Sequence, residues 1–367
     1  MSPGPPFNFN YSGVFLSYFL RIERKNGQII HKFLTGLQLL EFELQIQTFG
    51  KYLFFPLKRQ LNKNEIKLLI NLNIPYKIEE KSSKKAKINR INSLKDEFKK
   101  VLNQKEIDLI PHSFDVLGHV LIIDFPVELQ EKKKLITKIL IEQLKPVKSV
   151  VQKLGPVTGE LRVREYELLE GDKDLETIYT ENNCKYKLDI SKVFFNPRLS
   201  SERMRIAELI DINDNVLDMF AGVGPFTCLI AKKAKARITA IDLNPYAIFY
   251  LQYNIKLNKV EHLVNVIEGD IRNVLKDRFH FAFDKVIMNL PEKSYEFLDI
   301  ACKSIKKEGG IIYFYAFINE NDSNDEFLNK IKNIISNSFR NLKKINIHKV
   351  RLVAPYEWQV CYELSIK

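Results

Sequence analysis

The feature that most constrains the fold of this chain is a series of five short apolar runs in its second half. Helical patterns separate these runs, for example at residues 245–257 and 294–305. Strands that alternate with helices at this spacing are typical of a doubly wound parallel sheet. We therefore expect an α/β domain with a Rossmann-like sheet over residues 186–367, built on the runs NVLDMF, RITAID, HLVNVIEGD, DKVIMNL and GGIIYFYA. Two closing runs, NIHKVRLVA and WQVCYELSI, predict an antiparallel hairpin at one sheet edge.

The residues before this sheet are expected to form two smaller α/β domains, because a chain of 367 residues exceeds what one hydrophobic core usually supports. In residues 1–85 the patterns predict strands at 13–24 and 52–56 and helices at 28–40 and 63–72. In residues 91–185 they predict helices at 93–102 and 128–144, a strand at 116–125 and further strands within 149–171. The polar segment 79–90 is interpreted as a linker, and the first ten residues as a loose tail.

Composition narrows the class of partner and the cellular setting. Lys plus Arg number 57 against 45 Asp plus Glu, and a net charge of +12 favours a polyanionic partner over a merely solvated basic surface. The four cysteines are scattered and form no C-x-x-C pair, so we expect neither a metal site nor disulfides, and a reducing, cytoplasmic setting. The apolar run at residues 14–20 is too short to span a bilayer, and no membrane association is expected.

Acidic and glycine residues follow three successive predicted strands, at the sheet edge where ligands bind in folds of this kind. Asp218 precedes Gly222 and Gly224, Asp242 ends the second strand, and Asp270 follows the third. The glycines permit a tight turn and a close backbone approach to a ligand, although such a turn alone can serve only strand–helix packing. A carboxylate at Asp242 can accept hydrogen bonds from both ribose hydroxyls of an adenosine, and Asp270 can meet an adenine amino group.

A dinucleotide is the alternative ligand for this set, but two residues disfavour it. The dinucleotide fingerprint G-x-G-x-x-G requires a third glycine where this chain has Thr227. An acidic residue at Asp218 would repel a pyrophosphate and suits a cationic ligand instead. We therefore predict S-adenosylmethionine, which carries an ammonium and a sulfonium group.

The fourth strand ends in Asn289-Leu290-Pro291, and an Asn followed by Pro at this place is typical of methyltransferases that act on nitrogen of a planar base. An ordinary strand-end turn is the competing interpretation. Two further candidates lie upstream. Glu202 occupies the first turn of a predicted helix, where it could simply form a capping box. Arg162 and Arg164 share one face of a predicted strand, which could also be a solvated or phosphate-binding face.

These segments together resemble the archaeal and eukaryotic type of tRNA (guanine-37) N1-methyltransferase. The resemblance runs from about residue 20 to the C-terminus and rests on GELRVRE, DISKVFFNPRLSSER, VLDMFAGVGPF, AIDLNPYAI, NIKLNKVEH and VIMNLP in that order. It implies a class I methyltransferase domain preceded by two smaller RNA-binding domains, of which the first contacts the outer corner of the tRNA. The partner implied is tRNA, held also at its anticodon stem and loop, with no membrane and no obligate protein partner.

The resemblance also implies roles for individual residues. Glu202 would be the general base, Arg162 would stabilise charge on guanine O6, and Asn289 and Pro291 would read the guanine edge. Phe194 stands where the family often has Tyr, which leaves that side chain only stacking. The cofactor would contact Arg198, Asp218, Phe220, Gly222, Gly224, Asp242, Leu243, Asp270, Ile271 and Asn289.

Three other activities stay open from the sequence. Some archaeal members of the family also methylate carbon 7 of a tricyclic wyosine precursor at position 37. Related enzymes of wyosine synthesis transfer the aminocarboxypropyl arm of the same donor. A tRNA-binding protein without catalysis is disfavoured by the set of Asp218, Asp242 and Asn289.

Overall fold

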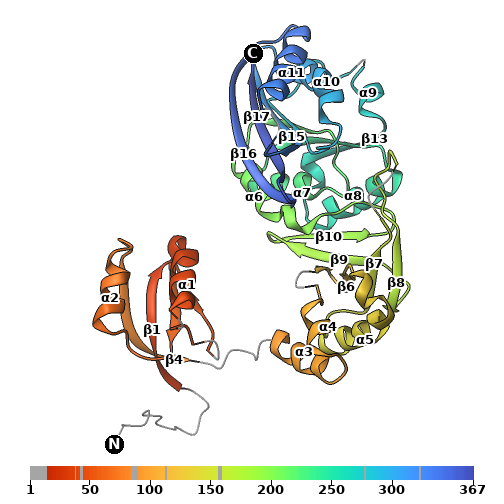
Figure 1. Cartoon of the computed structure of the whole chain (residues 1–367). Coiled ribbons are helices and arrows are strands. Elements are labelled where there is room, and N and C mark those ends of the chain that lie inside the picture. The colour runs from red at the N-terminus through yellow and green to blue at the C-terminus, as the bar shows by residue number, and fades with distance from the viewer. Residues whose placement is uncertain are drawn as a thin grey trace, which may run out of the picture. The chain divides into compact units, whose positions relative to one another are not determined.

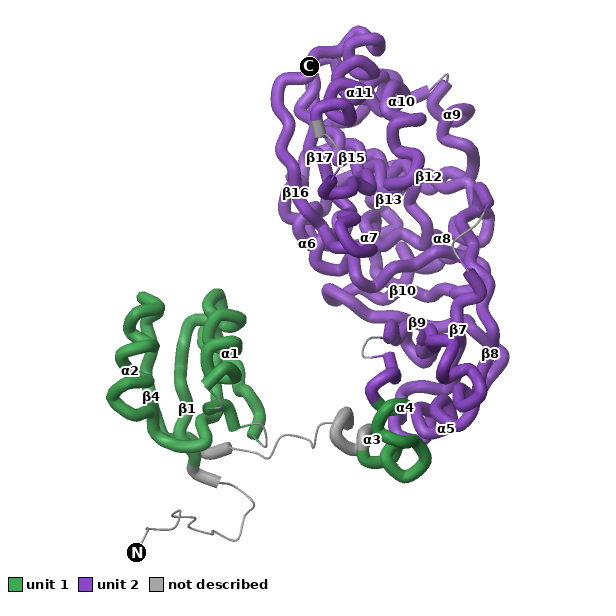
Figure 2. Tube along the Cα trace, in the orientation of Figure 1, with its two compact units in different colours: residues 1–107 green, residues 108–367 purple. Residues whose placement is uncertain are grey.

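The computed structural model describes residues 15–37, 39–41, 44–83, 90–111, 114–155, 159–276, 278–321 and 324–367. The chain separates into two compact units, residues 1–107 and residues 108–367 (Figure 2). The first ten residues, interpreted as a loose tail, lie outside the described residues. All four cysteines are described, buried and free.

The first unit is built on a four-stranded antiparallel sheet in the order β2-β3-β1-β4 (Figure 1). Its strands are β1 (Phe15–Glu23), β2 (Gln47–Phe49), β3 (Tyr52–Leu57) and β4 (Tyr76–Ser83). Its helices are α1 (Gly27–Gly36), α2 (Lys63–Ile70) and α3 (Arg90–Lys99), and α4 (Gln104–Asp108) ends at the boundary between the units. Helix α2 begins with a capping box between Asn62 and Glu65, which satisfies the first free backbone N–H groups.

The linker predicted over residues 79–90 is wrong for its first part, because residues up to Ser83 continue β4 and pair with β1. The alternating charged residues of this segment belong to a strand with a polar face, and such a pattern resembles that of an exposed loop. Residues 84–89 lie outside the described residues.

The second unit begins with a four-stranded sheet in the order β5-β6-β7-β8. Its strands are β5 (Asp115–Leu117), β6 (Val120–Ile122), β7 (Ser149–Lys153) and β8 (Tyr166–Gly171), with α5 (Lys133–Gln143) between β6 and β7. The single strand predicted at 116–125 is instead a hairpin of β5 and β6. The turn depends on Gly118, whose φ is +57° and where an added Cβ would lie 2.1 Å from Thr177 Oγ1.

A two-stranded hairpin of β9 (Glu176–Glu181) and β10 (Cys184–Asp189) follows, which the sequence did not predict. The domain boundary placed after residue 185 therefore falls inside β10. Helix α8 (Pro245–Leu257) holds this strand, because the side chains of Asn254 and Asn258 accept hydrogen bonds from the backbone N–H groups of Lys187 and Lys185.

The large sheet confirms all five predicted strands and the closing hairpin. Its order is β13-β12-β11-β14-β15-β17-β16, and the first five strands are parallel. These five are β11 (Asn215–Asp218), β12 (Arg237–Asp242), β13 (Val264–Glu268), β14 (Lys285–Met288) and β15 (Gly310–Asn319). The antiparallel strands β16 (Leu342–Ala354) and β17 (Glu357–Ile366) complete the sheet, with β16 at the edge.

Helices cover both faces of this sheet, which is why its central strands read as continuous apolar runs (Figure 1). One core includes side chains from α6 (Ser200–Glu208), α7 (Pro225–Ala234) and α8. The other includes α9 (Ile271–Val274), α10 (Leu298–Ser304) and α11 (Asn324–Asn337). The strand order reverses between β11 and β14, and ligands in open α/β sheets bind at such a point.

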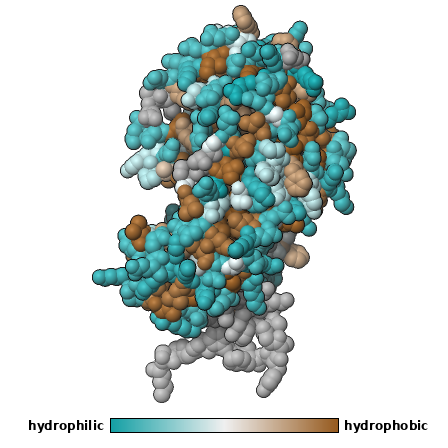
Figure 3. Space-filling model, turned by 90° about the vertical axis from the view of Figure 1, so that its right-hand side faces the viewer, coloured by the Kyte–Doolittle hydropathy of each residue, from teal (hydrophilic) through white to brown (hydrophobic). Residues whose placement is uncertain are grey.

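The face drawn in Figure 3 is mainly hydrophilic, with scattered hydrophobic patches. Among the residues that the structure describes, no helix combines the length and the apolar character needed to cross a membrane.

Candidate active site

A cavity of about 490 Å³ opens at the carboxyl ends of the parallel strands, where the strand order reverses. This volume falls within the range typical of small-molecule sites. Nine of the predicted residues line it: Arg162, Phe220, Gly222, Asp242, Leu243, Asp270, Ile271, Asn289 and Pro291. Four predicted residues do not line it: Arg198, Glu202, Asp218 and Gly224.

The two glycines after β11 have different roles. Gly222 has a φ of +55° and lines the cavity, and an added Cβ there would meet no atom closer than Phe194 O at 4.0 Å. Gly224 has a φ of +85°, and its added Cβ would lie 2.3 Å from Leu251 Cδ1 of α8. Gly222 therefore leaves room for a ligand, whereas Gly224 permits close packing of the loop against a helix.

Asp242 at the end of β12 is held rigidly at the cavity wall. Its Oδ2 accepts a hydrogen bond from Gly222 N at 2.6 Å, and its Oδ1 accepts one from Asn244 N at 2.9 Å. Burial raises the pKa of Asp242 above its ordinary value, and these backbone hydrogen bonds oppose that rise. A carboxylate fixed in this way is a preorganised acceptor for ligand hydroxyl groups.

Asp218 lies buried at the end of β11, one side of its carboxylate satisfied and the other not. Thr227 Oγ1 donates to Asp218 Oδ2 at 2.8 Å, but Oδ1 has no hydrogen-bond partner among the described residues. Burial, with the nearby Asp242 adding to it, raises the pKa of Asp218 to about 7. Because Asp218 does not line the cavity, its carboxylate can act on a ligand only from behind the glycine loop, where a negative charge disfavours a pyrophosphate.

The third wall of the cavity combines Asp270 with apolar side chains. Asp270 caps α9 and pairs with Arg272, which lowers the pKa of the Asp270 carboxyl. Phe220 and Phe297 meet edge to face at a centroid distance of 5.2 Å, and both line the cavity with Ile271. Apolar walls beside one carboxylate match the flat, partly polar surface of an adenine ring.

Arg162 is brought to the Asn289-Leu290-Pro291 corner by an ion pair that links residues 130 positions apart. Its Nη1 donates to Glu292 Oε2 at 2.7 Å, and the guanidinium carbon lies 5.7 Å from the ring centre of Phe194. The corner itself is fixed by Ser294, whose hydroxyl donates to Leu290 O at 2.9 Å. The structure therefore brings Arg162 beside the Asn289-Leu290-Pro291 corner. Arg162 lies in a turn with a φ of +54°, so the strand predicted for Arg162 and Arg164 is wrong at these residues.

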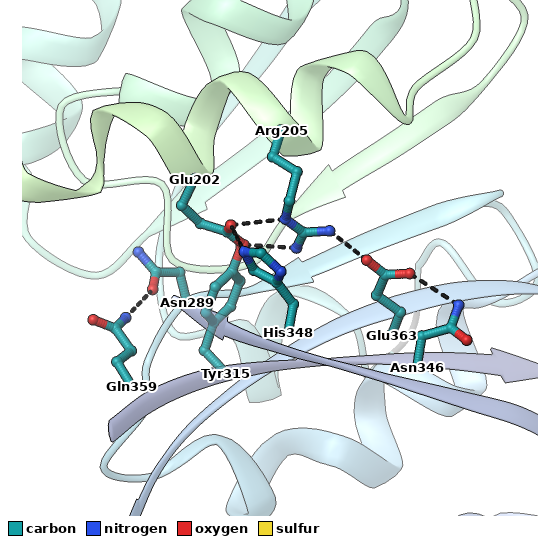
Figure 4. Close-up of polar contacts among 8 residues, drawn as sticks. All are labelled: Glu202, Arg205, Asn289, Tyr315, Asn346, His348, Gln359 and Glu363. Carbon is teal, nitrogen blue, oxygen red and sulfur yellow. Dashed lines mark hydrogen bonds and ion pairs between the residues drawn. The ribbon is translucent and has the colours of Figure 1, made fainter. Parts of the chain in front are cut away.

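Glu202 does not line the cavity, although its neighbour Arg203 does. Its two carboxylate oxygens accept hydrogen bonds from Arg205 at 2.8 Å each, and Oε1 also accepts one from the Tyr315 hydroxyl at 2.7 Å (Figure 4). His348 Nε2 lies 3.5 Å from Oε2. Successive helical residues point about 100° apart, so the placement of Arg203 at the cavity turns Glu202 toward the sheet.

A further predicted residue lies outside the cavity, and some residues that line it were not predicted from the sequence. Arg198 donates to Asp115 Oδ1 at 2.9 Å instead of lining the cavity. Asn244, Arg203 and Gln359 line the cavity but were not predicted. Asn244 had a signal, because Asn before Pro marks a helix start and its side chain caps α8. No sequence signal marks Gln359, since only the pairing of β17 with its neighbouring strands brings Gln359 to the cavity.

Comparison with known proteins agrees with this geometry. Residues 177–343 match the model of the TRM5/TYW2 methyltransferase domain, and residues 94–174 match that of the TYW2 N-terminal domain. The chain is 33% identical to the tRNA (guanine(37)-N(1))-methyltransferase Trm5b of Pyrococcus abyssi, over 95% of this chain and 98% of that protein. It is 34% identical to the tRNA(Phe) (4-demethylwyosine(37)-C(7)) aminocarboxypropyltransferase of Pyrococcus horikoshii, over 73% and 94% of the two chains.

Solved structures give the same assignment. A complex of aTrm5 with tRNALeu superposes with a TM-score of 0.64 at 34% identity, covering 95% of this chain and 99% of that one. The TYW2 of M. jannaschii in complex with AdoMet superposes with a TM-score of 0.55 at 27% identity, covering 70% and 99%. From its sequence, its sheet order and its cavity, the chain belongs to the TRM5/TYW2 family of methyltransferases.

Proposed function

We propose that this chain transfers a methyl group from S-adenosylmethionine to N1 of guanosine 37 in tRNA. The observation that carries the proposal is one cavity that joins Asp242 and the Gly222 loop to Arg162 and the Asn289 corner. The Pyrococcus abyssi Trm5b, which aligns over 98% of its own length, bears the name of this activity.

The cofactor is assigned to the part of the cavity between β11, β12 and β13. Asp242 would accept hydrogen bonds from the ribose, and Phe220, Leu243 and Ile271 would enclose the adenine beside Asp270. The buried carboxylate of Asp218, behind the cavity wall, would attract the positive end of the methionine moiety without touching it. S-adenosylmethionine supplies an electrophilic methyl group on a sulfonium centre.

The target base is assigned to the wall that carries Arg162, Asn289 and Pro291. Guanine N1 bears a proton at neutral pH, so this proton has to leave as the methyl group arrives. Negative charge then spreads toward O6, where donors from Arg162 and the Asn289 amide would stabilise it. The base has to leave its stack to reach the wall, as enzymes that act on bases require.

Glu202 is proposed as the group that takes up the N1 proton. In the structure its carboxylate is engaged by Arg205 and Tyr315, so the side chain has to exchange these contacts for the base when substrate enters. Catalytic hydrogen bonds often form only in the substrate complex. Arg198 and Gly224 are proposed to act behind the cavity wall, through Asp115 and Leu251 respectively.

The other parts of the chain are proposed to bind tRNA. Residues 1–85 would contact its outer corner, and residues 91–185 together with the methyltransferase domain at 186–367 would hold the anticodon stem and loop. Lysines at 132–134 and 145–153 would suit phosphate contacts. A cytoplasmic location and the absence of an obligate protein partner are part of the same proposal.

The test is incubation of an unmodified tRNA transcript with methyl-labelled S-adenosylmethionine, followed by nucleoside digestion. We expect label in 1-methylguanosine and S-adenosylhomocysteine as the by-product. The relationship to TYW2 makes aminocarboxypropyl transfer the second candidate, and methylthioadenosine as by-product would favour it. Mass spectrometry of tRNA-Phe that carries the wyosine precursor distinguishes a member that also methylates carbon 7.

A further inference from the structure

Gln359 lies in a row of side chains that crosses the sheet to the cavity. Strand pairing places Gln359 of β17 opposite Arg351 of β16 on one side and opposite Phe317 of β15 on the other. All three side chains line the cavity together with Asn289, and Gln359 is only 3% exposed. A buried amide has to satisfy both of its ends, so its neighbours determine its orientation.

Two hydrogen bonds connect this row to the predicted base-reading residue. Arg351 Nε donates to Gln359 Oε1 at 3.1 Å. Gln359 Nε2 in turn donates to Asn289 Oδ1 at 3.4 Å (Figure 4). Arg351, Gln359 and Asn289 therefore form a relay from the sheet edge to the end of β14.

The direction of this relay is fixed by chemistry. A guanidinium donates hydrogen bonds and cannot accept them, so the oxygen of the Gln359 amide has to face Arg351. The nitrogen of Gln359 then faces Asn289, and only the oxygen of Asn289 can accept from it. The Asn289 nitrogen is consequently turned away from Gln359, as Figure 4 shows.

We propose that Gln359 is a positioning residue that sets the polarity of Asn289, so that Asn289 presents an N–H donor to the target base and selects a purine with oxygen at position 6. Guanine and hypoxanthine carry an acceptor there, whereas adenine carries an amino donor. An Asn289 free to rotate by 180° about its amide would present its oxygen equally well, and would favour the amino group. The inference rests on the proposed function, because it assumes that a purine edge meets Asn289.

Gln359→Glu tests the direction of the relay. The new carboxylate keeps the bond from Arg351, but its second oxygen can only accept, so Asn289 has to turn its nitrogen toward it. Gln359→Met removes both hydrogen bonds at similar volume and leaves Asn289 unrestrained. We expect kcat for guanosine-37 transcripts to fall about 100-fold in Gln359→Glu, as for loss of an oxyanion donor, and about tenfold in Gln359→Met. The cofactor Kd should change less than about threefold in both, because the ribose and adenine contacts are untouched.

Two controls separate positioning from stability. Gln252→Glu makes the same chemical change at an exposed position of α8 that does not line the cavity, and it should leave kcat unchanged. In an Asn289→Ala background Gln359→Glu should cost no further activity, because the residue it reorients is gone. Affinities for guanosine-37 and adenosine-37 transcripts, measured with S-adenosylhomocysteine bound, give a readout independent of turnover.

The outcomes decide between the accounts. Two results together support the relay. The preference for guanosine over adenosine falls at least about tenfold in Gln359→Glu, and kcat falls further in Gln359→Glu than in Gln359→Met. If Gln359→Glu is as active as wild type, or loses the same factor with and without Asn289, the relay is wrong. If wild type itself does not methylate guanosine 37, the proposed function fails instead, and the two failures are thereby distinguished.

Discussion

The environment of Asp218 differs strongly from that of a free side chain. It is fully buried, one oxygen has no partner among the described residues, and its pKa is raised to about 7. The folded protein thus binds a proton at Asp218 more readily than the unfolded chain does. This side chain contributes stability that is fully present below its unfolded pKa of about 4 and is lost as pH rises through about 7.

We therefore expect Asp218→Asn to reduce the loss of stability that accompanies the rise in pH from about 4 to about 7. Between pH 5.5 and pH 8 the wild-type free energy of unfolding should fall by roughly 2 kcal/mol more than that of the variant. Denaturant titrations of both proteins across this range measure the difference. Asp172→Asn, at an exposed position, serves as the control and should follow the wild type. Parallel pH profiles for wild type and Asp218→Asn would contradict this account.

Asp242 and Glu202 should separate cofactor binding from chemistry. Loss of the Asp242 carboxylate removes the acceptor for the ribose, so Asp242→Ala is expected to weaken cofactor binding by about 10- to 100-fold.

Glu202→Gln is expected to lower turnover at least about 100-fold with little change in cofactor affinity. Calorimetry with S-adenosylmethionine and single-turnover rates check both. An effect of Glu202→Gln confined to cofactor affinity would show that Glu202 is not the proton acceptor.

At the scale of elements, Asn254 ties three segments together around the cofactor loop. It is fully buried in α8, and its Nδ2 donates to Val223 O of the glycine loop at 3.0 Å and to Lys187 O of β10 at 3.0 Å. Its Oδ1 accepts from Lys187 N at 2.7 Å. A hairpin edge and a ligand-binding loop are thus satisfied by one side chain, where the chain would otherwise bury free backbone groups.

Asn254→Leu should therefore be strongly destabilising. It leaves one buried and two partly buried backbone groups without this partner, and the free energy of unfolding should drop by about 2–4 kcal/mol. The variant should also bind S-adenosylmethionine more weakly, because the loop loses its anchor. Asn346→Ala removes a single exposed contact to Glu363 and should change stability by less than about 0.5 kcal/mol. Equal stabilities for the two variants, from chemical denaturation, would refute the role given to Asn254.

Some helices and strands of this fold can be predicted from local sequence patterns, and others cannot. The parallel strands follow from apolar runs, because a strand covered on both faces is apolar along its length. The closing hairpin follows from its two alternating runs, of which β16 is an exposed edge strand. Strand-end residues such as Asp242 and Asn289 were found because parallel strands place their carboxyl ends at one sheet edge. The β9–β10 hairpin, the turn at Gly118 and the row of Gln359 and Arg351 were missed. They depend on pairing between distant segments, which leaves no local pattern.

For the whole molecule, the net charge of +12 predicts that binding of tRNA is strongly electrostatic. Each phosphate neutralised by Lys or Arg releases counterions, so affinity falls steeply with salt. Raising salt from 50 to 200 mM should increase the KM for tRNA by at least about tenfold and leave the KM for S-adenosylmethionine nearly constant. Initial rates at fixed saturating concentrations of the other substrate measure each value. Equal salt dependence of the two KM values would argue against phosphate contacts.

The measurement that tests the central claim most directly is methylation of tRNA transcripts that differ only at position 37. Guanosine and inosine share O6 and a proton at N1, whereas adenosine has an amino group and no such proton. We expect labelled methyl groups to enter transcripts with guanosine or inosine at this position and not those with adenosine. Labelling of adenosine as fast as guanosine, or no labelling of guanosine by protein that binds S-adenosylmethionine, would contradict the claim.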